Sequence, residues 1–242
     1  MRIINIAKCV LTRCEFTAET VYPGDKAPSP EYQHSATHLL FMTAAHESGG
    51  FIFRRQRGFG RNTRGGAFGL WQTQVPSLID NIKYIVQHRE LLDRLLLNLP
   101  QECINILNMC VAHVGTMEGT SEVLRDTLIF LQQRESDQLA CAFARVHYLR
   151  QPGLIPSDIY SMAKYAKQYY NTRGGKASTE LYLSAYQRQI KKTEEPTYVE
   201  ISNEAIVRGR TSMLRDELCI NGTHTVRGDI LGGGAERGTS GE

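Results

Sequence analysis

The stretch Ser35-Ala-Thr-His-Leu-Leu-Phe-Met-Thr-Ala-Ala-His-Glu-Ser-Gly-Gly50 decides the prediction of the fold. Apolar or compact residues recur in it at helical spacing, on the side that also carries a glutamate: Ala36, Leu39, Leu40, Thr43 and Glu47. Gly49 and Gly50 then favour termination, because glycine is common just past the end of a helix. We therefore predict a helix that ends at Glu47.

Similar spacing, with apolar residues three or four apart, recurs along much of the remaining chain. It predicts helices over Pro76 to Leu99, Glu102 to Gly115, Ser121 to Gln133, Asp137 to Arg150, Ser157 to Asn171 and Ser178 to Lys191. The serines or aspartate at several of these starts suit helix N-caps. Alternation with period two is almost confined to Thr197 to Ser202, so we predict a mainly α fold with at most a minor β-hairpin.

The chain divides into three predicted parts. Residues 1–34 look mixed and irregular and end in proline-rich and glycine-rich turns, so we interpret them as an N-terminal lead-in segment. Residues 35–192 form the predicted helical domain, interrupted by a loop rich in glycine and arginine over residues 51–70. Residues 193–242 form an extended C-terminal tail, which is too rich in glycine to pack alone and needs a partner surface.

Composition excludes several classes of protein. The chain has 242 residues of which 41% are hydrophobic, enough for a sizeable core, and its net charge of +3 is too small to indicate specific nucleic-acid binding. Its six cysteines form no CxxC pair, so we expect no metal and no cofactor. We expect reduced, buried thiols and synthesis in a cytoplasm. No segment approaches the roughly 18 apolar residues of a membrane span, and no export signal is apparent.

Two motifs near the predicted end of the helix resemble those of a known family. Ala45-His46-Glu47-Ser48-Gly49-Gly50 and Gly66-Ala67-Phe68-Gly69-Leu70-Trp71-Gln72 resemble the Glu-Ser and Gly-Leu-Met-Gln signatures of soluble lytic transglycosylases and goose-type lysozymes. Trp71 stands where methionine is usual. The family's Ala-Tyr-Asn-Ala-Gly motif is missing, and Val111-Ala112-His113-Val114-Gly115 stands at a comparable distance.

A second stretch supports the same resemblance. Residues 144–172, with Ala144-Arg145-Val146-His147-Tyr148-Leu149-Arg150 at their start, are similar to the C-terminal part of lysozyme-like domains in bacteriophage and prophage virion proteins. The resemblance covers roughly residues 35–191. It implies a lysozyme-like fold and a virion-associated enzyme that cleaves peptidoglycan.

The resemblance also implies the site residues. Glu47 would be the catalytic acid, with Ser48 beside it in the Glu-Ser pair. Gly69 and Leu70 would give backbone contacts to a sugar, Gln72 a side-chain amide near the acid, and Tyr148 a hydroxyl that reaches the cleft. Trp71 and Phe68 are at least as well suited to core packing as to stacking on a sugar.

The chemistry of glycosidic cleavage is consistent with Glu47. The acid must keep its proton near neutral pH in order to give it to the leaving oxygen. A glutamate at the end of a helix, on its apolar side, is partly desolvated and faces the negative end of the helix dipole. Both effects raise the pKa of its carboxyl.

A second carboxylate is absent from the adjacent sequence. Between Ser48 and Ile79 there is no aspartate or glutamate, whereas two-carboxylate glycosidases place a nucleophile or base about 5 to 9 Å from the acid. One acid suits a transglycosylase, in which the sugar's own acetamido and 6-hydroxyl groups complete the reaction and give a 1,6-anhydro product. Hydrolysis stays open, because an aspartate distant in sequence can reach the cleft.

Two further groups have alternative interpretations. The arginines of the loop have no acidic partner nearby in sequence: Arg54, Arg55, Arg57, Arg61 and Arg64. They either solvate the loop or form a positive rim that attracts the anionic wall. The tyrosines at 160, 165, 169, 170, 182 and 186 occur at helical spacing and are expected to pack the C-terminal helices together.

The sequence thus predicts a phage virion enzyme that cuts the MurNAc-GlcNAc bond with one glutamate and aids wall penetration during genome ejection. Its expected partners are peptidoglycan glycan strands and other tail, portal or ejection proteins, bound through the tail in an assembly of multiple copies. It would be made in the host cytoplasm, reside in the virion and act on the periplasmic wall. Two alternatives stay open: a free endolysin for host lysis, and a structural virion protein whose lysozyme-like domain does not cut.

Overall fold

The computed structural model describes residues 5–24, 26–56, 66–116, 122–171 and 177–194. These residues all belong to one compact unit that spans Arg2–Val199, and the chain's other unit, with Glu200–Glu242, lies outside them. The predicted tail, including the alternating stretch Thr197 to Ser202, therefore lies outside the described residues except for Thr193 and Glu194.

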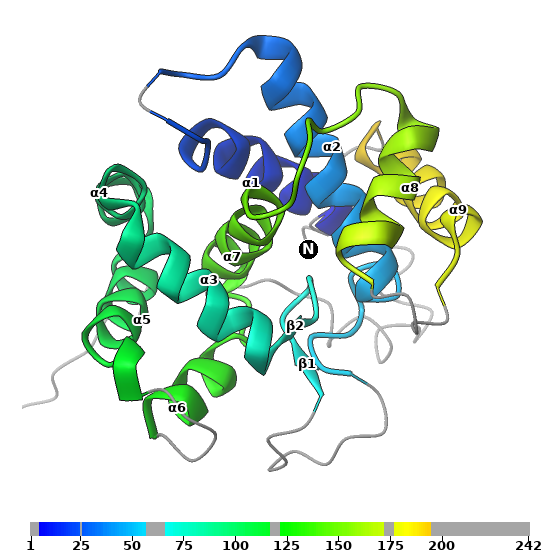
Figure 1. Ribbon diagram of the computed structural model, residues 1–242. Coiled ribbons are helices and arrows are strands. Elements are labelled where there is room, and N and C mark those ends of the chain that lie inside the picture. Colours follow the sequence, from blue (N-terminus) through cyan, green and yellow to red (C-terminus); the bar gives the residue numbers. More distant parts are fainter. Residues whose placement is uncertain (1–4, 25, 57–65, 117–121, 172–176, 195–242) are drawn as a thin grey trace, which may run out of the picture. The chain divides into compact units, whose positions relative to one another are not determined.

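The described part of the chain is mainly helical, as predicted (Figure 1). Its α-helices are α1 (Ile6–Thr20), α2 (Pro30–Glu47), α3 (Val75–Gln87), α4 (Arg89–Asn98), α5 (Gln101–Ala112), α6 (Glu122–Phe130), α7 (Asp137–Leu149), α8 (Ile159–Tyr169) and α9 (Thr179–Ile190). Two short 3₁₀ helices, η1 (Val114–Thr116) and η2 (Lys191–Glu194), complete the helical elements. One antiparallel hairpin joins β1 (Ala67–Phe68) to β2 (Thr73–Gln74).

Helix α2 is the central element and ends at Glu47, as its sequence predicts. It contacts α1, α7, α8 and α9, so apolar or small residues are buried on almost every side of it. The Ser29 side chain accepts a hydrogen bond from the Tyr32 N–H and Pro30 begins the helix, a favourable start. At the other end the Gly50 N–H bonds back to the Ala45 carbonyl over 2.8 Å, and Gly49 and Gly50 both have positive φ angles.

The N-terminal segment differs from its prediction. Residues 6–20 are not irregular but form α1, which packs against α2 and α7. Its buried residues recur at mostly helical spacing: Ala7, Val10, Cys14, Thr17, Ala18 and Thr20. Small and weakly apolar side chains make this stripe inconspicuous in sequence. The segment is therefore part of the core, and α2 begins at Pro30 rather than at Ser35.

The predicted helix over Pro76 to Leu99 is also two helices rather than one. His88 separates α3 from α4 with φ −117° and ψ 84°, which is not a helical conformation. The other predicted helices agree with the structure to within a few residues at their ends. Cys103, Cys110 and Cys141 are fully buried free thiols, as predicted.

The Gly-Leu-Trp-Gln motif forms the turn of the hairpin. Phe68 pairs with Thr73 on either side of Gly69-Leu70-Trp71-Gln72, and Gly69 and Gln72 both have positive φ angles, 74° and 48°. Trp71 is fully buried, and its indole N–H donates to the Leu40 carbonyl over 2.9 Å. The motif thereby fastens the hairpin to α2, so Gln72 lies near Glu47.

Candidate active site

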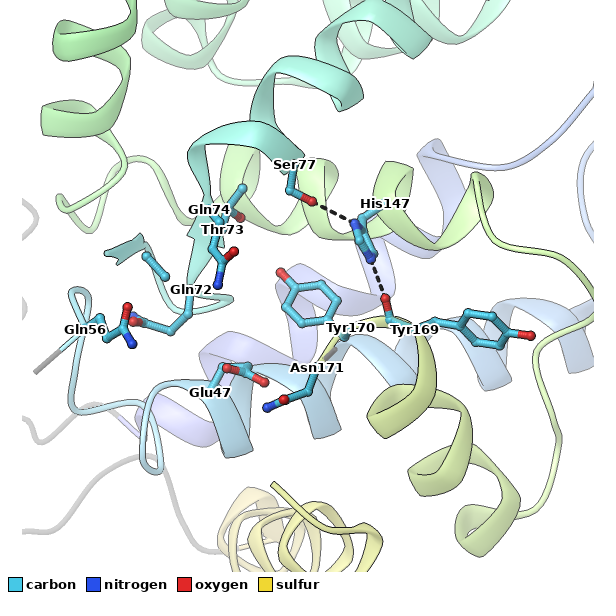
Figure 2. A pocket seen from close by; sticks show the side chains of 11 residues that line it. Glu47, Gln56, Gln72, Thr73, Gln74, Ser77, His147, Tyr169, Tyr170 and Asn171 are labelled. Atoms are coloured by element: carbon cyan, nitrogen blue, oxygen red, sulfur yellow. Dashed lines mark hydrogen bonds between the residues drawn. The ribbon is translucent and has the colours of Figure 1, made fainter. Parts of the chain in front are cut away.

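Glu47 lies where two adjoining hollows meet. One is a cavity of about 510 Å³, whose lining includes Glu47, Gln72, Tyr170 and Asn171 (Figure 2). The other, of about 480 Å³, lies toward the loop that follows α2 and is lined in part by His46 and Ile52. Glu47, Gln56 and Gln72 line both. Glu47 therefore forms part of the boundary between the two hollows.

Three neighbouring side chains act on the Glu47 carboxyl. The Tyr182 hydroxyl of α9 donates to Glu47 Oε1 over 2.5 Å. The Asn171 side chain hydrogen-bonds the same carboxyl, and the positive charge of Lys167 in α8 acts on it through space. These groups lie in α8 and α9 or just after α8, so the Glu47 carboxyl is held by segments that are distant in sequence.

Burial nevertheless dominates the ionisation of Glu47. Desolvation of the carboxyl raises its pKa above that of an ordinary glutamate, and the Tyr182, Asn171 and Lys167 interactions lower it by less. A carboxyl with a raised pKa keeps its proton at higher pH, as a general acid requires.

Glu47 is the only carboxylate among the described residues that line the two hollows. Its polar neighbours there are amides, hydroxyls, imidazoles and one guanidinium. Three of the lining residues of the 510 Å³ cavity are glutamines: Gln56, Gln72 and Gln74. Amides both donate and accept hydrogen bonds without charge, which suits the hydroxyl and acetamido groups of a sugar.

Among the predicted substrate-binding residues, Gln72 lines both hollows together with the acid. Its side-chain nitrogen donates to the Gly69 carbonyl over 2.8 Å and to the Phe53 carbonyl over 3.3 Å. These bonds fix the amide against the hairpin turn and orient it beside Glu47.

The other predicted contacts do not line either hollow. Ser48 is fully buried, and its hydroxyl donates to the Ala44 carbonyl and accepts from the Phe51 N–H. Leu70 is fully buried, and the Gly69 N–H donates to the Arg54 carbonyl over 2.9 Å. Tyr148 lies beneath the site, where its hydroxyl and that of Thr43 are 2.7 Å apart. In this structure these residues therefore lie behind the lining and support it.

Arg54 has an acidic partner that lies far away in sequence. Its guanidinium pairs with Asp137 at the start of α7, with Nη2 2.8 Å from Oδ2. The partner is 83 residues away, so local sequence did not reveal it. Arg55 lies over the Phe68 ring and lines the second hollow. Arg57, Arg61 and Arg64 lie outside the described residues.

The C-terminal tyrosines do more than pack helices. Tyr182 bonds the acid, and Tyr170 lines the cavity while donating to the Trp71 carbonyl over 2.6 Å. The sequence did not predict this position of Tyr170 and Tyr182, nor that Asn171, Ser77 and His147 line the cavity. The clue present in the sequence was that Tyr170 and Asn171 belong to the second stretch that resembles lysozyme-like domains.

No group of three or more His, Cys, Asp or Glu side chains in the described segments is arranged to hold a metal ion. No helix among them is long and apolar enough to cross a membrane.

Comparison with known proteins assigns no relative. No family model matches the chain, and no curated protein and no solved structure is significantly similar to it.

Proposed function

We propose that this chain cleaves the glycosidic bond between MurNAc and GlcNAc in peptidoglycan, with Glu47 as its general acid. One observation carries the proposal. Glu47 is a partly buried carboxyl with a raised pKa, and it is the one carboxylate in the described lining of two hollows that meet at it. The likeness of residues 45–50, 66–72 and 144–172 to lytic transglycosylases and lysozyme-like domains supplies the substrate class.

In the proposed reaction, protonated Glu47 gives its proton to the glycosidic oxygen while the bond from that oxygen to the sugar carbon breaks. The 6-hydroxyl of the same sugar then bonds to that carbon and returns a proton to the Glu47 carboxylate. The products are a shortened glycan and a 1,6-anhydro sugar end. Tyr182 and Asn171 hold the carboxyl in one orientation throughout, since both bond it in the resting state.

The single carboxylate favours transglycosylation over hydrolysis. A two-carboxylate hydrolase needs a second acid about 5 to 9 Å from the first, and the described lining offers amides and hydroxyls instead. These groups can bind a sugar but are weak bases. Internal attack by the 6-hydroxyl needs no strong second base, so it fits this site better.

The second sequence stretch indicates a biological setting. Residues 144–172 resemble parts of phage and prophage virion proteins, so we propose a virion enzyme that opens the host wall locally. Residues 193–242 are proposed to tether it to other virion proteins. A free endolysin would have the same site and chemistry. The buried carboxyl with a raised pKa between two hollows favours an enzyme over a non-cutting structural domain.

The experiment is to incubate the purified protein with peptidoglycan and identify the new glycan ends by mass spectrometry. Transglycosylation predicts 1,6-anhydro-muropeptides. Reducing ends alone would show hydrolysis, and an unchanged glycan would refute the proposed function.

A further inference from the structure

A serine and a histidine face each other in the wall of the same cavity. Ser77 Oγ of α3 lies 2.9 Å from His147 Nδ1 of α7, and both residues line the 510 Å³ cavity that Glu47 shares. Figure 2 shows the pair beside Tyr170, across the cavity from Glu47. The reaction proposed for Glu47 uses neither residue.

The hydrogen bonds on the imidazole fix its tautomer. His147 Nε2 lies 2.7 Å from the Tyr169 carbonyl oxygen, which can only accept, so Nε2 carries the proton. In the neutral ring Nδ1 then has a free lone pair and accepts the hydrogen bond from the Ser77 hydroxyl. This arrangement is a nucleophile, a base and a group that orients the base.

The surroundings keep the base neutral and in place. Burial lowers the pKa of His147, so the imidazole is unprotonated at neutral pH. The rings of Tyr148 and Tyr170 pack edge-on against it, with centroids 5.8 and 4.9 Å away. Ser77 lies in the first turn of α3, where the helix dipole stabilises negative charge that develops during attack.

We propose that Ser77 and His147 form a second active centre, an esterase that removes acyl groups from sugar hydroxyls of the glycan bound in the Glu47 cavity. The serine chemistry stands on its own geometry, and the choice of a sugar as the alcohol rests on the proposed function.

The group that orients His147 indicates that the substrate is an ester rather than an amide. A backbone carbonyl orients His147 but brings no full negative charge to stabilise the imidazolium, so the pair is a weaker base system than one completed by a carboxylate. Esters have a better leaving group than amides and need less assistance. The cavity serves both centres, and an acylated 6-hydroxyl cannot attack in the reaction proposed for Glu47. Removal of that acyl group would restore the substrate.

The step balances with water as the only co-reactant. Ser77 Oγ bonds to the ester carbonyl carbon, and the hydroxyl proton passes to His147 Nδ1. The bond between that carbon and the sugar oxygen then breaks, and the sugar oxygen takes the proton from Nδ1. Water then bonds to the acyl carbon, its proton passes through Nδ1 to Ser77 Oγ, and the carboxylic acid leaves.

The test is covalent labelling of the full chain with diisopropyl fluorophosphate, which reacts with activated serines, followed by peptide mass spectrometry. We expect one adduct, on Ser77, and a labelling rate about 10²- to 10⁴-fold lower in His147→Gln. Ser161 provides the control, because it also lies in the first turn of a helix but is paired with Asp158 instead of an imidazole. Labelling of Ser77 no faster than that of Ser161 in the wild-type protein would overturn the proposal without requiring any variant to fold.

A second measurement tests the substrate. The wild-type protein should release acetate from O-acetylated peptidoglycan, and Ser77→Ala should not, while circular dichroism shows that the variant is folded. Labelled Ser77 without acetate release would refute the sugar ester as substrate. Cleavage of unacetylated glycan by the wild-type protein is measured in parallel. This cleavage tests the proposal for Glu47 and does not depend on Ser77, so the two proposals can fail separately.

Discussion

The ionisation of Glu47 links the chemistry of the site to the stability of the fold. Its pKa is raised in the folded protein, chiefly by burial. Between the ordinary glutamate pKa of about 4.3 and the raised value, the folded chain binds more protons than the unfolded chain. The free energy of unfolding therefore falls as pH rises through that window, and the ionised carboxyl destabilises the fold above it.

Replacement of Glu47 by glutamine should therefore stabilise the protein at pH 7. The amide keeps the shape and can still accept from Tyr182, but it carries no charge to desolvate. The gain should disappear as pH falls below about 4, where the wild-type carboxyl is protonated in both states. Urea unfolding at several pH values measures this difference. Glu19→Gln is the matched control, since Glu19 lies in the last turn of α1 but is exposed. A Glu47→Gln effect that does not vary with pH would contradict the account.

Tyr182→Phe should move the pH dependence of glycan cleavage. The hydroxyl donates to the ionised carboxyl and lowers the pKa of Glu47, so its loss lets that pKa rise further. Activity that needs protonated Glu47 should then persist to a pH higher by about one unit, given the strength of a hydrogen bond to a charged group. The measurement is the rate of wall cleavage against pH. Tyr160→Phe is the control, because Tyr160 is 49% exposed, and it should not change the pH profile of cleavage. An unchanged pH profile in Tyr182→Phe would show that Tyr182 does not lower the pKa of Glu47.

At this scale the sequence predicted that the helix ends at Glu47, but not which residues surround that glutamate. Glu47 stands out because a helical stripe, a glycine stop and a motif coincide at one place. Tyr182 lies 135 residues further on and Ser77 lies 70 residues before His147, so only the packing of α2 with α9 and of α3 with α7 brings each pair together. No local spacing encodes such contacts.

The element that shapes the rim of the site is the loop after α2, and one ion pair anchors it. The Asp137 carboxylate is almost completely buried and pairs with Arg54 and, at 4.0 Å, with Arg13. The Arg54 carbonyl in turn accepts a hydrogen bond from the Gly69 N–H. Removal of one partner from a buried pair leaves an uncompensated charge. The pair therefore couples the start of α7 to both the loop and the hairpin.

Asp137→Asn should consequently lower the free energy of unfolding by about 3 kcal/mol. Asp93→Asn is the comparison, because Asp93 forms an exposed pair with Arg89 within α4 that contributes about 0.5 kcal/mol or less. Chemical denaturation of both variants measures the contrast. Equal losses would show that the Arg54–Asp137 pair does not anchor the loop.

Helices were predicted well where an apolar stripe and an N-cap residue indicate the same helix. Ser178 caps α9 by accepting from the Leu181 N–H, and the predicted helix over Asp137 to Arg150 matches α7, which is buried along most of its length. Prediction was wrong where one local signal was weak. His88 is not a helix breaker by residue type, so the separation of α3 from α4 depends on how the two helices pack, which sequence spacing does not express.

For the molecule as a whole, the N-terminal segment matters most. Helix α1 covers α2 and α7, and the Asn5 side chain donates to the Lys192 carbonyl in η2, so the two ends of the described chain meet. A lead-in segment would tolerate substitution, whereas a core helix tolerates it on one face only.

Val10→Asp should therefore destabilise the whole unit, by about 3 kcal/mol or more, because it places an unpaired charge where 1% of the side chain is exposed. Thr12→Asp adds the same charge to an exposed position of the same helix and should change little. Thermal unfolding of the two variants distinguishes a core helix from an appendage. Similar melting temperatures for both would mean that α1 is dispensable.

The most direct test of the central claim is a comparison of peptidoglycan digests by the wild-type protein, Glu47→Gln and Glu19→Gln. The account predicts anhydro-muropeptides from the wild-type protein and Glu19→Gln at equal rates. It predicts a rate about 10²- to 10⁴-fold lower from Glu47→Gln, which folds but has no proton to give. Undiminished cleavage by Glu47→Gln would contradict the assignment of Glu47 as the acid.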